Sequence, residues 1–262
     1  MIALTDALNH EIILKHSPKR IVSLVPSISY TLHRLGLDDD VVGITRFCKF
    51  PERWKKTKSI IGGTKDLKIE RIKELHPDFI IANKEENTKE QVEALQNIAP
   101  VYVSDVYDLD SNRRFLMDMG TLFDKYDTVD EIIHNIDKHQ FKTEKFTSFK
   151  SVYLIWKEPW MSIGGDTFID KMMQIAGFEN LFSYEKRYPS FAFSKLIDLQ
   201  PEVLLLSSEP FPFKEKHKEE LQKFLPKTKI ILVEGEPFTW FGAYAEKALP
   251  YFKSLQKSLT HA

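Results

Sequence analysis

One pattern occurs twice in this chain, and this repetition is the strongest constraint on its fold. The stretch IERIKELHPDFII (Ile69–Ile81) aligns with FSKLIDLQPEVLL (Phe193–Leu205) at a constant offset, with apolar, charged and proline positions matching. In both copies an amphipathic helical stretch ends near a proline, and an apolar run typical of a buried strand follows. The repetition therefore indicates two similar α/β halves rather than one continuous sheet.

The segments around the repeat alternate between strand and helix patterns. KRIVSLVPSISYTLHRLG contains an apolar run (Ile21–Val25), a proline, a serine at a capping position (Ser27) and an amphipathic stretch that closes at Gly36. A similar helix ended by glycine occurs in MQIAGFENLF, before the second copy of the repeat. Strands that alternate with helices form parallel sheets covered on both faces. The expected fold is α/β, with two similar Rossmann-like lobes.

The pattern changes between Ser111 and Lys150, where two helical stretches occur without a strand between them. The second stretch is long and charged, and it follows Thr128, a residue suited to cap a helix. We interpret it as a rigid connector helix, and an ordinary surface helix is the alternative. The expected organisation is an N-terminal lobe over residues 1–125, a connector helix over 126–148 and a C-terminal lobe over 149–262.

The loops that follow the predicted strands are expected to line a cleft, because ligands of open parallel sheets bind at the carboxyl ends of the strands. In the second half these loops are rich in aromatic residues, which suit flat or apolar ligands. The alternative for any one ring is that it seals the core beneath its loop. The aromatic candidates are Trp156, Trp160, Phe211, Phe213, Phe238, Trp240, Phe241 and Tyr244. The loops TKD and NKEEN are expected to orient the ligand rim through Thr64, Lys65, Lys84 and Asn87.

Motifs of common enzyme classes are absent from the sequence. There is no Walker loop, G-x-S-x-G elbow, H-E-x-x-H or G-x-G-x-x-G motif. GGDT (Gly164–Thr167) could cradle an anion, but a turn in which Asp166 or Thr167 caps the next helix is the favoured interpretation. Cys48, the single cysteine, has no neighbouring base and is expected to be a structural or bystander thiol rather than a nucleophile. No catalytic residue and no catalytic cofactor is expected.

Histidine spacing and overall charge exclude further classes. The eight histidines show no metal-ligand spacing, and His76, His134 and His217 are expected on the solvated surface. The net charge of -1 gives no general attraction to nucleic acid or to a membrane. The first residues lack a secretory signal pattern, which leaves either a removed signal or a cytoplasmic protein. The apolar runs are of strand length.

Several of these motifs together resemble the helical-backbone solute receptors, the ABC-importer binding proteins for cobalamin, haem and ferric siderophores. The matching pieces are KRIVSLVPSISYTLHRLGLDDDVVGIT, IERIKELHPDFIIA, the connector helix, EPWMSIGGDTFIDKMMQIAGFENLF and WFGAYAEKAL. They run in order over nearly the whole chain. The resemblance implies two α/β lobes bridged by one long helix, with a metal chelate held between them. Its cobalt or iron would belong to the ligand.

Within this family the chain is most similar to the cobalamin-binding branch. That likeness implies contacts to the corrin from Phe50 and Trp160, and a ligand-facing loop at Trp240–Phe241. The chain departs from the branch at Thr64 and Asn83, where cobalamin receptors carry tryptophans. The family also implies docking of an ABC permease through one acid in each lobe, at or near Glu70 and Glu209. A monomeric receptor is expected; the alternative function is a cytoplasmic tetrapyrrole-handling protein or chelatase-like enzyme.

Overall fold

The computed structural model describes residues 1–140 and 146–260 of the chain, which divide into two compact units. Unit 1 comprises Met1–Asn135 and Trp240–Tyr244, and unit 2 comprises Ile136–Thr239 and Ala245–Ala262. The division differs from the expected lobes in two respects: the boundary lies at Asn135, inside the expected connector, and the short segment Trp240–Tyr244 belongs to unit 1. Within the described residues no helix combines the length and the apolar character needed to cross a membrane.

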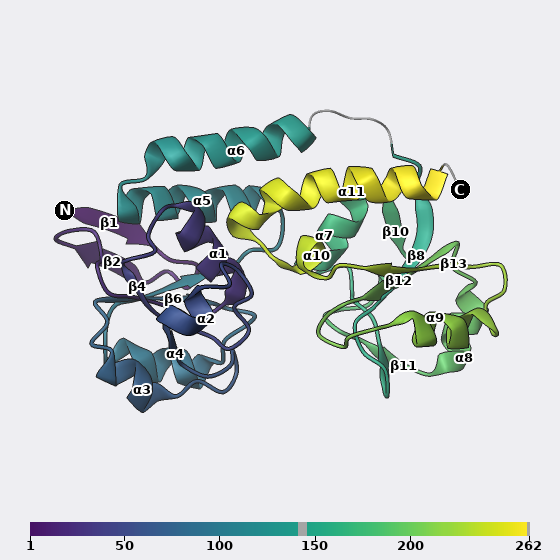
Figure 1. The fold of residues 1–262 in the computed structure, drawn as a ribbon, viewed down its shortest axis with the longest axis horizontal. Coiled ribbons are helices and arrows are strands. Elements are labelled where there is room, and N and C mark those ends of the chain that lie inside the picture. Colours follow the sequence, from purple (N-terminus) through teal and green to yellow (C-terminus); the bar gives the residue numbers. More distant parts are fainter. Residues whose placement is uncertain (141–145, 261–262) are drawn as a thin grey trace. The chain divides into compact units, whose positions relative to one another are not determined.

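Unit 1 is built on a five-stranded parallel sheet. Its strand order is β5 (Ser59–Ile60), β4 (Val41–Ile44), β3 (Ile21–Ser23), β6 (Phe79–Asn83) and β7 (Val101–Ser104). The helices are α1 (Pro26–Arg34), α2 (Trp54–Thr57), α3 (Ile69–Glu74), α4 (Lys89–Gln96) and α5 (Leu109–Phe123). Helices α3 and α4 lie on one side of this sheet and α5 on the other (Figure 1). An antiparallel hairpin, β1 (Ile2–Thr5) and β2 (Glu11–Leu14), precedes the sheet.

Unit 2 is built on a second parallel sheet of four strands. Its strand order is β10 (Phe178–Asn180), β8 (Phe149–Leu154), β12 (Val203–Ser207) and β13 (Lys229–Val233). The antiparallel pair β9 (Trp160–Met161) and β11 (Ser190–Phe191) is separate. The remaining elements are α7 (Phe168–Ile175), α8 (Phe193–Leu199), α9 (Glu215–Gln222), α10 (Glu236–Thr239) and α11 (Ala245–Thr260). The short helix η1 (Gly242–Tyr244) lies in the segment that belongs to unit 1.

The two sheets confirm the α/β repeat predicted from the sequence. Strand order β4-β3-β6-β7 in unit 1 corresponds to β10-β8-β12-β13 in unit 2, and each repeated motif forms a helix followed by a central strand. The residues before the two prolines, His76 and Gln200, share a left-handed backbone with φ of 45°. This conformation ends each helix and lets proline start the next segment. Ile80 and Leu204 lie in different sheets, as expected for two lobes.

The expected connector helix corresponds to α6 (Tyr126–Gln140), and the boundary between the units falls inside it. Residues 141–145 of the expected helix lie outside the described residues. Phe146–Ser148 are not helical, so the predicted end at residue 148 was wrong. Strand β8 begins at Phe149, so the chain leaves the helix before that residue.

Candidate ligand-binding surfaces

The carboxyl edge of the unit 2 sheet carries aromatic side chains at the point where the strand order reverses. The chain runs from β8 to β10 on one side and then returns to β12 on the other side of β8. Trp156 follows β8 and Phe211 follows β12, and their rings meet edge to face at 5.7 Å between centroids. The Phe211 N–H donates to the Ile155 carbonyl over 3.2 Å and ties the two loops together. A topological switch point is the usual ligand position in such sheets.

Trp160 lies on the same edge and is held from two sides. Its ring is 5.5 Å from that of Phe193, and the Lys157 ammonium lies 5.6 Å from the Trp160 ring centroid. Glu220 on α9 accepts two hydrogen bonds from that ammonium, at 2.7 and 2.9 Å. Trp160 and Phe211 are half-buried, and Trp156 is 39% exposed. These three rings therefore keep surface that a ligand could cover.

His217 is buried, which corrects the expectation of a solvated histidine. His217 is the third residue of α9. The rings of Phe211 and Phe213 pack against it, with centroid distances of 5.4 and 5.6 Å. The Lys214 N–H donates to Nδ1 over 3.0 Å. Burial, with the nearby Lys216 and Lys157 ammonium groups, lowers the pKa of His217, so the imidazole is neutral at pH 7. His217 packs against the two phenylalanines of the aromatic loop, whereas His76 and His134 are exposed as expected.

The expected aromatic residues near the C-terminus are mostly core. Phe238 is fully buried against Phe252, and Phe213 is also buried. Trp240, Phe241 and Tyr244 are each about 5–6% exposed and pack inside unit 1. Their ring contacts are Tyr244 with Tyr30 at 5.1 Å, Phe241 with Phe115 at 5.3 Å and Trp240 with Phe50 at 6.1 Å. Packing accounts for these rings, and ligand contact by them stays a prediction.

The polar candidates follow strands β5 and β6 at the carboxyl edge of the unit 1 sheet. Asn87 is buried, and its amide donates to the Thr64 carbonyl over 2.8 Å and accepts from the Asn83 N–H over 2.9 Å. It therefore joins the two loops that carry the other candidates. Lys65 is exposed, and Lys84 pairs with Asp105 at 2.6 Å. Thr64 is half-buried.

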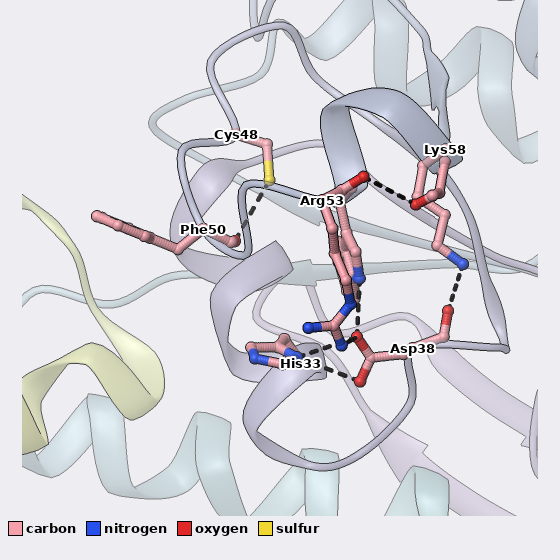
Figure 2. A network of polar contacts seen from close by, with 8 residues as sticks. His33, Asp38, Cys48, Phe50, Arg53 and Lys58 are labelled. Carbon is pink, nitrogen blue, oxygen red and sulfur yellow. Dashed lines mark hydrogen bonds and ion pairs between the residues drawn. The ribbon is translucent and has the colours of Figure 1, made fainter.

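A polar network around Asp38, which sequence reasoning missed, holds the loop that carries Phe50 (Figure 2). The Asp38 carboxylate accepts from Trp54 Nε1 over 2.8 Å, lies 3.1 Å from His33 Nδ1 and pairs with Arg53. Partial burial opposes ionisation, but the hydrogen bonds from Trp54 and His33 and the charges of His33 and Arg53 hold the pKa of Asp38 below its ordinary value.

The same figure shows the ring of Phe50 pointing away from the network. Cys48 is fully buried, with Sγ 3.4 Å from the Phe50 carbonyl oxygen, and burial raises the pKa of its thiol. This agrees with a structural cysteine. The network and Cys48 together fix the backbone on either side of Phe50, which leaves the half-buried ring in a defined position.

The remaining candidates have clear places in the fold. Thr167 caps α7 by accepting from the Asp170 N–H, which confirms the capping interpretation of GGDT. Glu70 is exposed in the first turn of α3. Glu209 is half-buried, and its carboxylate accepts from the Thr239 hydroxyl over 2.9 Å. In the repeated helix of unit 2, the position that corresponds to Glu70 is Ser194. Among the described residues no group of three His, Cys, Asp or Glu side chains could hold a metal ion.

Two parallel sheets of matching strand order, with aromatic side chains at a switch point, define a ligand-binding α/β protein rather than a barrel or a helical bundle. Comparison with known proteins specifies the class. Residues 21–229 match the family model described as "Periplasmic binding protein". The chain belongs to this family of substrate-binding proteins, which confirms the resemblance inferred from its motifs.

Two curated relatives illustrate the family. The chain is 23% identical over 217 residues to the Bacillus subtilis protein named "Uncharacterized ABC transporter substrate-binding lipoprotein YvrC", covering 78% of this chain and 68% of that protein. It is 25% identical over 197 residues to a "Vitamin B12-binding protein" of Vibrio campbellii, covering 72% and 70%. Both matches extend over most of each sequence.

Solved structures show the same fold. The periplasmic vitamin B12 binding protein BtuF of Vibrio cholerae superposes with a TM-score of 0.80 at 15% identity, covering 94% of this chain and 100% of that one. The periplasmic heme-binding protein BhuT, in complex with two hemes, also gives a TM-score of 0.80, at 18% identity and coverages of 92% and 99%. Because both sequence identities are low, these two superpositions show a shared fold and do not identify the ligand of this chain.

Proposed function

We propose that this chain is a non-enzymatic receptor that binds a metal chelate and delivers it to an ABC importer outside the cytoplasm. The observation that carries the proposal is the group of partly exposed aromatic rings, Trp156, Trp160 and Phe211, at the switch point of the unit 2 sheet. Large rigid rings at such an edge suit a flat macrocycle or a compact chelate. Relatives named for vitamin B12 and structures named for heme support the same ligand class.

Direct binding measurements test this proposal. Calorimetry of the full chain with cyanocobalamin, haemin and a ferric siderophore is expected to show saturable binding of at least one compound. The reason is that a bound chelate would cover the partly exposed aromatic rings and remove their apolar surface from water. A buried macrocycle should also give a negative heat-capacity change. If none of the three compounds binds, the receptor function is wrong. The aromatic edge would then require a different explanation, such as a protein interface.

Glu70 is proposed to face the permease, since it is exposed in the first turn of α3 and lies outside the loops that carry the ligand-binding candidates. Glu209 is the second docking candidate; its half-buried carboxylate accepts a hydrogen bond from the Thr239 hydroxyl, and its docking role stays a prediction. Glu70→Ala is expected to leave chelate affinity unchanged and to reduce uptake into cells that express the cognate importer. Glu74→Ala, on the same helix, is the matched control. Normal uptake with Glu70→Ala, or a loss of affinity, would contradict the docking role.

A further inference from the structure

His217 has a fixed tautomer, which makes one of its ring nitrogens a hydrogen-bond donor. The Lys214 N–H donates to Nδ1 over 3.0 Å, so Nδ1 presents its lone pair to that group. Burial and the nearby ammonium groups lower the pKa of His217, and the ring is neutral at pH 7. A neutral imidazole carries one ring proton, and in His217 this proton must therefore lie on Nε2.

The Nε2–H group forms no hydrogen bond within the part of the chain that the structure describes. His217 is only 8% exposed. The polar side-chain atoms that are sealed without a partner in the described residues are Thr45 Oγ1, Gln91 Oε1 and Gln256 Oε1, and Nε2 is not one of them. The donor therefore reaches solvent although most of its side chain is covered. A ligand that displaced this water would have to supply an acceptor.

The side chain of His217 borders the partly exposed aromatic rings of unit 2. Its ring lies 5.4 Å from that of Phe211, which meets the ring of Trp156 at 5.7 Å. Three residues further along α9, Glu220 binds the ammonium group that lies over the Trp160 ring. Residues three apart share one face of a helix. The same face of α9 therefore carries residues next to both groups of rings.

The charges around the imidazole favour an anionic acceptor over a neutral one. Besides burial, three cations lower the pKa of His217 and one nearby acid raises it. The cations are Lys216, Lys157 and Lys214, and the acid is Glu220, which is paired with Lys157. Lys214 and Lys216 are exposed and are not among the cations that form ion pairs in the described chain. They leave a positive potential at the donor, which a carboxylate would use together with the hydrogen bond.

Other acids of unit 2 act mainly elsewhere. Glu215 is in the first turn of α9, but its carboxylate lies 3.7 Å from the Lys218 ammonium. Glu158 and Glu234 are exposed after β8 and β13, and neither is among the groups that shift the pKa of His217. The immediate surroundings of Nε2–H therefore stay positive.

We propose that His217 determines ligand specificity at the aromatic edge of unit 2, where its Nε2–H donates to a carboxylate oxygen of the ligand and does not coordinate the ligand's metal. The inference rests on the proposed function and specifies one group of the ligand. A ring nitrogen that carries the proton has no lone pair for a metal ion. The acceptor is therefore a carboxylate on the periphery of the chelate, and Lys214 and Lys216 strengthen its attraction.

Two substitutions separate the roles of the two ring nitrogens. His217→Asn keeps an acceptor near the position of Nδ1 for the Lys214 N–H but has no group at the position of Nε2. His217→Gln keeps an amide N–H near the position of Nε2. Quenching of tryptophan fluorescence measures the affinity of each full-length variant for matched compounds. The pairs are haemin with its dimethyl ester, cyanocobalamin monocarboxylic acid with cyanocobalamin, and N-succinyl ferrioxamine B with ferrioxamine B.

The parent protein is expected to bind the acidic member of a pair more tightly than the neutral or cationic member. His217→Asn should weaken binding of the acidic member about tenfold, the size expected for one hydrogen bond to a charged acceptor. Binding of the other member should change less than about twofold, because it offers no carboxylate. His217→Gln should retain most of the affinity for the acidic member.

The role of the free cations is tested separately. Lys216→Gln should weaken binding of the acidic member about two- to fivefold, and this loss should shrink as salt screens the charge. Lys227→Gln is the matched control. It makes the same change at an exposed position just before β13, at the opposite end of that strand, and should leave the affinity unchanged.

Two spectroscopic measurements test the tautomer and the absence of metal coordination. Nitrogen NMR of the ligand-free protein at pH 7, with labelled imidazoles, should place the ring proton of His217 on Nε2. The visible absorption spectrum of the bound chelate should be the same in the parent protein and in His217→Asn, because the imidazole does not bind the metal.

The outcomes distinguish this inference from the proposed function. The inference is overturned, and the receptor function stands, if the proton lies on Nδ1, if His217→Asn changes the spectrum of the chelate, or if it binds the acidic member as tightly as the parent does. Tighter binding of the neutral or cationic member by the parent has the same meaning. If no compound of any pair binds, the receptor function is overturned and this inference with it.

Discussion

Replacement of Trp160 by alanine is expected to weaken chelate binding about thirty- to a thousandfold. Truncation of a well-packed aromatic contact costs about 2–4 kcal/mol, and each 1.4 kcal/mol is about a factor of ten in affinity. Trp160 qualifies because its ring is already fixed by Phe193 and by the Lys157 ammonium, so little rotamer freedom is lost on binding. Calorimetry with the chelate that binds the parent protein measures the change.

Two controls separate lost contact from lost structure. Trp160→Phe keeps a ring between Phe193 and Lys157 and should retain most of the affinity. Tyr126→Ala removes an exposed ring at the start of α6 and should retain all of it. Circular dichroism should show unchanged secondary structure for each variant. The aromatic edge is not the binding surface if Trp160→Ala binds as tightly as the parent.

Gly242→Ala is expected to lower the free energy of unfolding by about 2–6 kcal/mol. Gly242 has φ of 75°, a conformation that costs other residues about 1–3 kcal/mol. A Cβ there would lie 2.1 Å from Thr31 Oγ1, a hydroxyl that accepts from the Ala243 N–H and donates to the Ser27 carbonyl. Displacing Thr31 breaks buried hydrogen bonds worth about 1–3 kcal/mol. Urea denaturation of the full chain measures the loss.

Gly36→Ala provides the matched control for this prediction. Gly36 has nearly the same φ, 73°, but a Cβ there would meet no atom within 4 Å. Its substitution should show only the cost of backbone strain. Equal destabilisation by Gly36→Ala and Gly242→Ala would mean that the close approach to Thr31 contributes nothing.

The two sheets could be predicted from the sequence because the relevant signals are local. A helix that ends at proline and an apolar run of strand length are read within one short window, and the repetition supplied the pairing of the halves. The location of Trp240–Phe241 could not be read in this way. Its contacts are with Phe50 and Phe115, far away in the chain, and loop composition does not show which unit a loop packs against.

The charge partners at the edges were missed for a similar reason. Asp105 is separated from Lys84 by 21 residues, and Glu220 from Lys157 by 63. One signal was available, however. Lys84 and Asp105 each stand directly after a strand, β6 and β7, which are neighbours in the sheet. Opposite charges at the ends of adjacent parallel strands are therefore worth testing as pairs before either is assigned to a ligand.

The return of Trp240–Tyr244 to unit 1 limits how this protein can be divided. A gene fragment that encodes only Met1–Asn135 would leave Tyr30 and Phe115 without the rings that cover them, and Thr31 would lose the Ala243 N–H. Unit 2 expressed alone would have to carry that apolar segment as an exposed loop. Although each unit has its own sheet, neither is a separable module, and fragment exchange between relatives would need to transfer the C-terminal segment with the N-terminal half.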